Sequence, residues 1–181
     1  MKYEFVPGDE KVIAPGRTVK RIRALVSIAA FDVSAGDLGG YVESGKNLSQ
    51  VYGDAWVSGN AKVYDDARVS GNAHVSGITH VSGNAKVYGD ARVYSDARVS
   101  GNAEVYGDRL IFWATKVGRY NATLTVFNGK DGLIVTRGCF VGSVDEFLIK
   151  SEAEHDDATH IEYRMLIEVA HSRITRALEL K

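Results

Sequence analysis

Cysteine is nearly absent from this sequence, with Cys139 as the only one among 181 residues. No disulfide can therefore form within the chain, and this usage is typical of proteins that fold in a reducing compartment. Long apolar runs are absent too, because the longest, residues 24–31, is far shorter than the roughly 20 residues that a membrane-spanning helix needs. The sequence thus predicts a cytoplasmic protein that does not enter a membrane.

An excess of charge of one sign is also missing. The net charge is −1 at pH 7, and basic residues number 7, 5 and 10 in residues 1–50, 51–108 and 109–181, against 6, 7 and 10 acidic residues. General binding to nucleic acid needs a basic excess, so this balance excludes it. The sequence also lacks the G-x-S-x-G, H-E-x-x-H and phosphate-loop motifs of common enzyme classes.

A single six-residue pattern, V-[SY]-[GDS]-[ND]-A-x, fills a third of the chain. Valine occupies its first position ten times without a slip, and the fifth position is alanine in eight hexads and Thr79 in a ninth. In a short strand the first and fifth residues point the same way, inward, while Gly-Asn and Gly-Asp pairs at positions three and four suit a tight turn. A fixed period of this length predicts a solenoid. The valines are Val51, Val57, Val63, Val69, Val75, Val81, Val87, Val93, Val99 and Val105.

The pattern over residues 51–110 resembles that of hexapeptide-repeat proteins, which form a left-handed parallel β-helix. The resemblance implies that three hexads make one triangular coil of about 18 residues, with coils stacked at the roughly 4.8 Å spacing of strands. Residues 18 apart would then lie one above the other. The predicted fold is mainly β: N-terminal strands and a capping coil in residues 1–50, a left-handed parallel β-helix in 51–109, and a small C-terminal α+β domain in 110–181.

Upstream of the hexads the pattern becomes irregular. Val42 and Leu48 are six residues apart, but Val51 follows only three residues later and shifts the phase, which indicates a capping coil. The segments KYEFV and RTVKRIRALVSI, separated by a stretch with proline and glycine, are typical of strands that close this end. The second segment carries a basic cluster, which most often marks the solvated face of a hairpin, with a phosphate patch as the alternative. Its residues are Arg17, Lys20, Arg21 and Arg23.

Downstream, the segments LIFWATKV, NATLTVFN and GLIVTRGCFVG, with NGKDG as a turn, predict a small antiparallel sheet. Capping boxes at residues 143–146 and 159–162 predict two helices, and an apolar stripe on the second is expected to pack on the sheet. Cys139 falls in an apolar strand, so we expect a buried structural thiol. The stripe consists of Tyr163, Leu166, Ile167, Ala170, Ile174, Ala177 and Leu178.

The outward positions of the hexads provide the candidate binding residues. Stacked at 18-residue intervals, they would line grooves between the subunits of a trimer, where aromatic rings can stack on a base and cations can hold a phosphate. A tyrosine ladder also arises from cross-strand stacking alone or from a dry subunit contact. The main candidates are Tyr52, Trp56, His74, Tyr88, Arg92 and Tyr106; the secondary ones are Arg68, Lys86, His80 and Arg98.

Two enzyme classes share the hexapeptide-repeat fold. Acyltransferases that use coenzyme A or acyl carrier protein have a histidine base between subunits, a role open to His74 or His80, but the hexads lack the inserted loop that usually covers such sites. The γ-class carbonic anhydrases bind zinc through three histidines, whereas the 18-residue rule puts these two on different faces. Ligand types in residues 155–160 are typical of an acidic loop before a helix. We therefore expect no catalytic residue, no cofactor and no metal site.

The whole chain also resembles a group of proteins from temperate phages and prophages. The segments that carry this resemblance are RIRAL, AGDLGGYVE and NLSQ before the hexads and GRYNATLTVF, KDG, GCFVGS and DEF after them. The resemblance implies a phage origin and names no activity. We expect a non-catalytic homo-oligomer, with a trimer favoured, in the host cytoplasm, which sequesters a small anionic nucleotide-like ligand or blocks a host defence protein. A hexapeptide-repeat acyltransferase and a purely structural phage protein are the alternatives.

Overall fold

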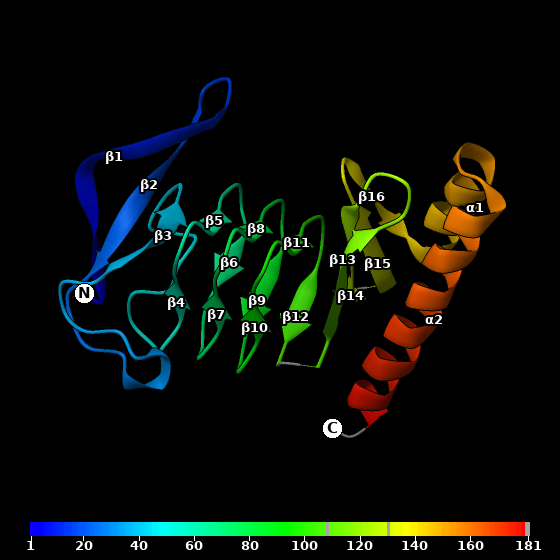
Figure 1. Cartoon of the computed structure of the whole chain (residues 1–181). Coiled ribbons are helices and arrows are strands. Elements are labelled where there is room, and N and C mark those ends of the chain that lie inside the picture. The colour runs from blue at the N-terminus through cyan, green and yellow to red at the C-terminus, as the bar shows by residue number, and fades with distance from the viewer. Residues whose placement is uncertain (108, 130, 180–181) are drawn as a thin grey trace.

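The computed structural model describes residues 1–107, 109–129 and 131–179. Three parts follow one another along a single axis: an N-terminal hairpin, a stack of short-stranded coils, and a C-terminal sheet with two helices (Figure 1). The fold is thus mainly β, with a parallel β-solenoid between two different ends, as the sequence predicts.

The N-terminal part is a long antiparallel hairpin that continues into the solenoid. Strands β1 (Tyr3–Ala14) and β2 (Arg17–Ala24) pair with each other, and β2 pairs with β3 (Leu38–Val42), which joins the first coil. The short 3₁₀ helix η1 (Ala29–Phe31) lies in the loop between β2 and β3.

The basic residues of β2 are used within this part of the chain. Arg17 forms ion pairs with Glu43 and Asp65, and Arg21 and Arg23 form ion pairs with acidic residues of β1. The interpretation as a hairpin face is therefore confirmed. A phosphate patch formed by all four cations is disfavoured, because three of them already have carboxylate partners.

Short parallel strands build the solenoid and stack as three narrow sheets. Registers join residues 18 apart, as in Val57 with Val75 and Val75 with Val93, so the predicted coil length is confirmed. The strands are β4 (Trp56–Val57), β5 (Lys62–Val63), β6 (Arg68–Val69), β7 (His74–Val75), β8 (His80–Val81), β9 (Lys86–Tyr88), β10 (Arg92–Val93), β11 (Arg98–Val99) and β12 (Glu104–Tyr106). One sheet contains β3, β5, β8 and β11, the second β4, β7 and β10, and the third β6, β9 and β12.

Each position of the hexad has the role that its chemistry allows. The valines from Val57 to Val105 and the small fifth residues between them are buried in one continuous core. The third position takes a positive φ at every turn, and this conformation favours glycine. Asp65 and Ser95 fill this position with φ of 60° and 66°.

The first coil is longer than the others. Val42 pairs with Val63 and Leu48 with Val69, and both pairs are 21 residues apart. The three additional residues loop out between Leu48 and Ala55, and Val51 is 76% exposed as a result. The predicted phase shift is therefore real, but the prediction that Val51 points inward is wrong, because Leu48 already fills that place.

The C-terminal end of the solenoid is closed by an antiparallel sheet of β13 (Ile111–Val117), β14 (Ala122–Gly129), β15 (Gly132–Arg137) and β16 (Phe140–Ser143). The predicted third strand is in fact two strands, because a turn at Gly138, with φ of 59°, divides it. Cys139 lies in this turn and is exposed, so the expectation of a buried thiol is wrong.

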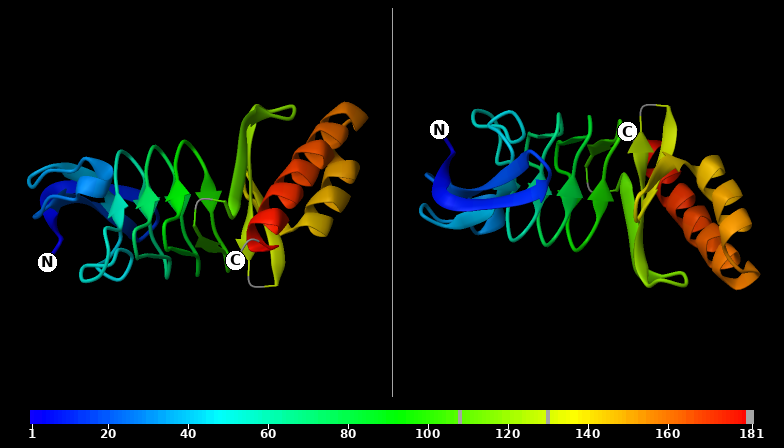
Figure 2. Two further views of the ribbon diagram at one scale, coloured as in Figure 1. Left: turned by 90° about the horizontal axis from the view of Figure 1, so that it is seen from below. Right: turned by 90° about the horizontal axis from the view of Figure 1, so that it is seen from above.

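The two faces of this sheet belong to different cores. Ile111 and Phe127 pack with the last valines of the solenoid, while Leu124, Val126 and Val135 pack against the helices. Both views in Figure 2 show the sheet standing between the coils and the helices. The sheet therefore acts as a cap that is itself covered on its outer side.

Two helices cover the outer face of the sheet: α1 (Val144–Glu154) and α2 (Asp157–Glu179). The capping box of Ser143 and Glu146 is confirmed. The second helix begins earlier than predicted, because the Asp156 side chain, and not that of Thr159, accepts from the backbone and occupies the cap. Tyr163, Ile167, Ala170 and Ile174 of the predicted stripe are buried against the sheet, as expected, whereas Leu178 is exposed. Within the described residues, neither helix has the length and apolarity needed to cross a membrane.

Candidate functional site

The sixth positions of the hexads form the columns that the sequence predicts. Trp56, His74 and Arg92 are paired in register on one sheet, Lys62, His80 and Arg98 on a second, and Arg68, Lys86 and Glu104 on the third.

The main candidate residues do not share one face within a single chain. A strand consists of the sixth position of one hexad and the first position of the next, and in β9 and β12 it also includes the second position, because the turn falls at positions three and four. Tyr88 and Tyr106 therefore lie on the sheet of Lys86, whereas Arg92 lies around the next corner. Within one chain these side chains therefore lie on different sheets, and whether a neighbouring subunit brings them together in a groove stays a prediction.

The loop between β2 and β3 covers the column of Trp56. The Trp56 side chain is only 1% exposed, so it cannot line an open groove. The ring of Phe31 stacks on His74 at 4.4 Å between centroids, and Arg92 lies 5.7 Å from the same ring. His74 Nε2 lies 2.8 Å from Ser58 Oγ, and burial, helped by the charge of Arg92, lowers the pKa of this imidazole.

On the sheet of β6, β9 and β12, the candidate tyrosines contact each other and the candidate lysine pairs with a glutamate. The rings of Tyr88 and Tyr106 lie 5.1 Å apart, and Lys86 pairs with Glu104 at 2.9 Å. Arg68 stacks in register with Lys86 and is exposed. Tyr52 is 80% exposed in the loop that contains the three additional residues. These contacts have the form of cross-strand packing on the solenoid surface.

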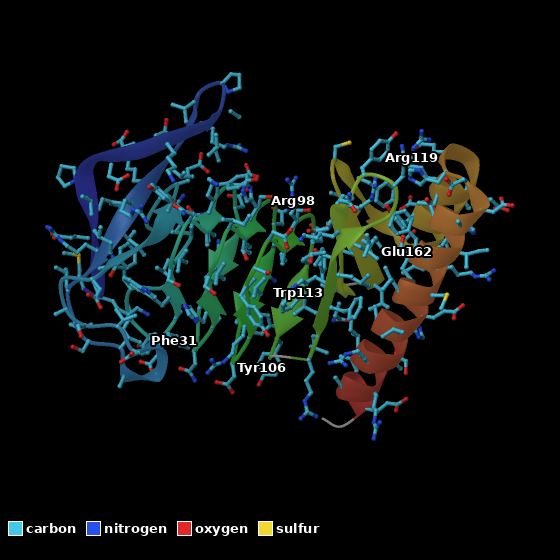
Figure 3. All side chains as sticks on the ribbon, viewed as in Figure 1. Phe31, Arg98, Tyr106, Trp113, Arg119 and Glu162 are labelled. Atoms are coloured by element: carbon cyan, nitrogen blue, oxygen red, sulfur yellow. The ribbon has the colours of Figure 1, made fainter. Side chains whose placement is uncertain are left out.

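A cleft lies over the remaining column, where the C-terminal sheet meets the solenoid. It has a volume of about 470 Å³, and Lys62, His80 and Arg98 line it from the solenoid side. The opposite wall consists of Asn121 in the turn between β13 and β14, Ala122 and Thr123 at the start of β14, and Gly138 in the turn between β15 and β16. Figure 3 shows Arg98 at this junction, on the opposite edge of the solenoid from Phe31. His80 and Arg98 were secondary candidates in the sequence, and the structure brings them together.

The electrostatic character of this cleft is set mainly by Lys62 and Arg98, neither of which forms an ion pair with a carboxylate among the described residues. Burial first, and then the charges of Lys62 and Arg98, lower the pKa of His80 from 6.5 to about 4. Burial, Lys11 and Arg98 in turn lower the pKa of Lys62. Burial is the larger cause of both shifts, and the repulsion between neighbouring positive charges adds to it; a bound anion would relieve the second cause.

The hydrogen bonds of His80 assign its tautomer. Lys62 Nζ lies 3.3 Å from Nε2 and can only donate, so Nε2 is the acceptor and Nδ1 carries the hydrogen. Tyr64 Oη lies 3.4 Å from Nδ1 and accepts it. Because the pKa of His80 is about 4, the ring is neutral near pH 7, which leaves Lys62 and Arg98 as the two charged groups of the column.

One carboxylate also lies at the cleft. Thr123 donates to Asp96 Oδ2, while Asp96 Oδ1 is buried and has no hydrogen-bond partner among the described residues. Arg98 is anchored to the same wall, since Nη1 donates to the carbonyl of Gly138 at 3.3 Å and its backbone carbonyl accepts from Thr136. The cleft therefore combines two cations with one carboxylate that favours a hydrogen-bond donor.

Sequence reasoning missed part of this site. The place of Lys62 beside His80 and Arg98 could have been recognised from the sequence, because Lys62 stands 18 residues before His80 and 36 before Arg98. Asn121, Thr123 and Gly138 could not have been recognised in this way, since they reach the cleft only through the docking of the C-terminal sheet onto the last coil.

No metal site emerges from these residues. His74 and His80 lie on different sheets, as the 18-residue rule requires. Within residues 1–107, 109–129 and 131–179, no three histidine, cysteine or acidic side chains gather in a way that would hold an ion.

Comparison with known proteins supports the architecture. A family model described as the YdcK beta solenoid repeat matches residues 61–77. This stretch, which is one residue shorter than an 18-residue coil, contains β5, β6 and β7. No curated protein matches the chain.

Proposed function

We propose that this protein is a non-catalytic binding protein that holds a small phosphate-bearing ligand, of nucleotide size, in the cleft over Lys62, His80 and Arg98. The observation that carries the proposal is the pair of cations, Lys62 and Arg98, that face a cleft of about 470 Å³ on either side of a neutral histidine. A volume of this order suits a small organic ligand.

The chemistry of the walls favours a ligand with two kinds of polar group. A phosphate group satisfies Lys62 and Arg98, which are charge-assisted donors. The unpartnered acceptor of Asp96 favours a ligand that also carries a hydroxyl or amino donor. A nucleotide combines these groups, whereas a bare inorganic anion has only the first.

Binding fits this site better than acyl transfer. A general base works best when its pKa lies near the working pH, and the pKa of His80 is about 4. His74 is covered by Phe31 and already engages Ser58. An acyltransferase remains the enzymatic alternative, and a coenzyme A-dependent assay of the wild-type protein with acceptor amines tests it.

The biological setting follows from resemblance and is part of the proposal. The likeness to phage and prophage proteins suggests that the ligand is a host molecule, removed from use by sequestration in the host cytoplasm. A homotrimer would multiply the sites, and the alternatives are a block on a host defence protein or a purely structural role.

The test begins with native mass spectrometry of the purified protein, which reads the subunit number and any bound mass together. Calorimetric titration with adenosine monophosphate, adenosine and sulfate then follows. We expect adenosine monophosphate to bind at least tenfold more tightly than adenosine, and Arg98→Met to reduce that affinity at least tenfold.

Arg92→Met provides the matched control, because Arg92 occupies the same hexad position of the same coil on another sheet. Its affinity for adenosine monophosphate should equal that of the wild type. Equal binding of adenosine and its monophosphate, or equal losses in both arginine variants, would refute the proposed site.

A further inference from the structure

A second pocket lies on the far side of the turn between β15 and β16. Its volume is about 410 Å³, and the turn, with Gly138 in both linings, separates it from the cleft described above. The walls come from β15, β16 and α1, and they are part apolar, with Phe140, Val141 and Phe147, and part polar, with Arg137, Lys150 and Ser151.

The notable group in this wall is the guanidinium of Arg137. Arg137 lies directly opposite Leu124 on β14 and Phe140 on β16. Because Leu124 packs against the helices, the side chain of Arg137 also lies on the helix-facing side of the sheet. Its Nε and Nη2 atoms are shielded from solvent and have no hydrogen-bond partner of good geometry within the described residues, and the same is true of Tyr163 Oη. Burial raises the pKa of the Tyr163 hydroxyl, and Arg137 lies close enough to this hydroxyl to oppose the rise.

Aromatic rings surround this charge but do not neutralise it. The guanidinium carbon lies 5.7 Å from the ring of Tyr120 and 5.2 Å from that of Tyr163. Such contacts contribute less free energy than the burial of an unpaired charge costs. Among the described residues, no carboxylate forms an ion pair with Arg137.

The other charged side chains of the pocket do not offset the positive charge of Arg137. Lys150 pairs with Glu154 at 3.2 Å, so these two side chains offset each other. The turn between β13 and β14 closes over the far side, where Gly118 donates to Glu162 (labelled in Figure 3) and approaches so closely that a Cβ would lie 1.8 Å from Tyr163 Oη. Arg137 lines the pocket on the remaining side.

We infer that this pocket binds a small carboxylate with an apolar body, which places its anionic group beside Arg137 and its body against Phe140 and Phe147. The rings of these two phenylalanines meet edge to face at 5.2 Å and form the apolar wall. A ligand of this class supplies the counter-charge that the chain does not, and it buries apolar surface at the same time.

The test uses benzoate and benzamide as probes, because they have the same shape and differ in charge. Calorimetric titration of the wild-type protein should show benzoate binding at least tenfold more tightly than benzamide. Arg137→Met should remove this preference without lowering the thermal midpoint of the ligand-free protein, since it replaces an unpaired buried charge by an apolar chain.

Two controls keep the result specific. Arg119→Met changes an arginine that contacts the same Tyr120 ring but does not line the pocket, and it should keep the preference for benzoate. Arg98→Met alters the cleft of the proposed function and should also keep it. Failure of one site is thereby distinguishable from failure of the other.

Cys139 gives an independent readout on the unmodified protein. It is the only cysteine, it is exposed, and it lines this pocket. Saturating benzoate should slow its alkylation by iodoacetamide several-fold, while benzamide at the same concentration should not. Equal affinity for the two probes, an unchanged alkylation rate, or the same benzoate preference in Arg137→Met and the wild type would each overturn the inference.

Discussion

At the scale of single residues, the turn position of the hexad sets the strictest demand. Its left-handed conformation costs a residue with a Cβ roughly 1–2 kcal/mol, which glycine avoids. At Gly71 the space is restricted as well, because a Cβ would lie 2.9 Å from the backbone nitrogen of Gly89. Asp65 and Ser95 show that the position tolerates a side chain, Asp65 with a further coil above it and Ser95 in the last coil.

The turns at Gly71 and Ser95 therefore predict opposite substitution effects. Ser95→Gly should raise the free energy of unfolding by about 0.5–1 kcal/mol, because it relieves strain that exceeds the entropy cost of glycine. Gly71→Ala should lower it by about 1–3 kcal/mol, since it adds strain and a backbone contact. Urea unfolding followed by circular dichroism measures both, and equal effects of the two substitutions would contradict this account.

His80 predicts a pH dependence of stability. Its pKa is about 4 in the folded chain and near 6.5 when unfolded, so the unfolded state binds more protons between these values. The contribution of neutral His80 is complete above pH 6.5 and is lost as the pH falls towards 4. The wild type should thus lose more stability than His80→Gln between pH 7 and pH 5 in urea titrations; parallel losses would show that another group is responsible.

At the scale of elements, the loop between β2 and β3 decides which hexad columns are accessible. Phe31 covers His74 although the two residues are 43 positions apart in the sequence, and nothing in the periodic pattern indicates that contact. The valines and alanines were predictable because alternation alone points them inward. The burial of Trp56 and His74 and the place of Asn121 in the cleft were not predictable, because the surroundings of these residues come from loops and sheets that dock from outside the repeat.

Removal of the Phe31 ring tests this shielding. Burial is the main reason for the lowered pKa of His74, and Phe31 supplies part of that burial. In Phe31→Ala the pKa of His74 should therefore rise towards 6.5, as measured by NMR titration of the imidazole protons. The pKa of His80, on another sheet, serves as the internal reference and should stay near 4.

At the scale of the whole molecule, the two ends make a finite protein out of an open repeat. Solenoid coils contact only their neighbours, so a terminal coil without a cap exposes its core. The hairpin continues into the first coil, and the C-terminal sheet lays Ile111 and Phe127 over the last valines. Register and burial within the coils were predictable, but the face that each cap presents was not, because it depends on the orientation in which the cap docks.

Two C-terminal truncations distinguish the role of the sheet from that of the helices that cover it. A chain that ends at residue 142 loses the helices but keeps the sheet on the solenoid end, and it should retain a cooperative thermal transition. A chain that ends at residue 107 loses the whole cap, and we expect it to associate or precipitate in sedimentation velocity experiments. A monomeric, cooperatively folded product from the shorter chain would show that the coils need no cover at this end.

If the cleft binds the proposed ligand, the 18-residue register also sets the length of ligand that it accepts. One end of the Lys62–His80–Arg98 row lies under Lys11 of the hairpin, and the other end meets the C-terminal sheet. Each coil adds one strand spacing, roughly 4.8 Å, between these two ends. A version of the chain with one coil inserted would accept a longer ligand and one with a coil removed a shorter ligand, with the chemistry at both ends unchanged.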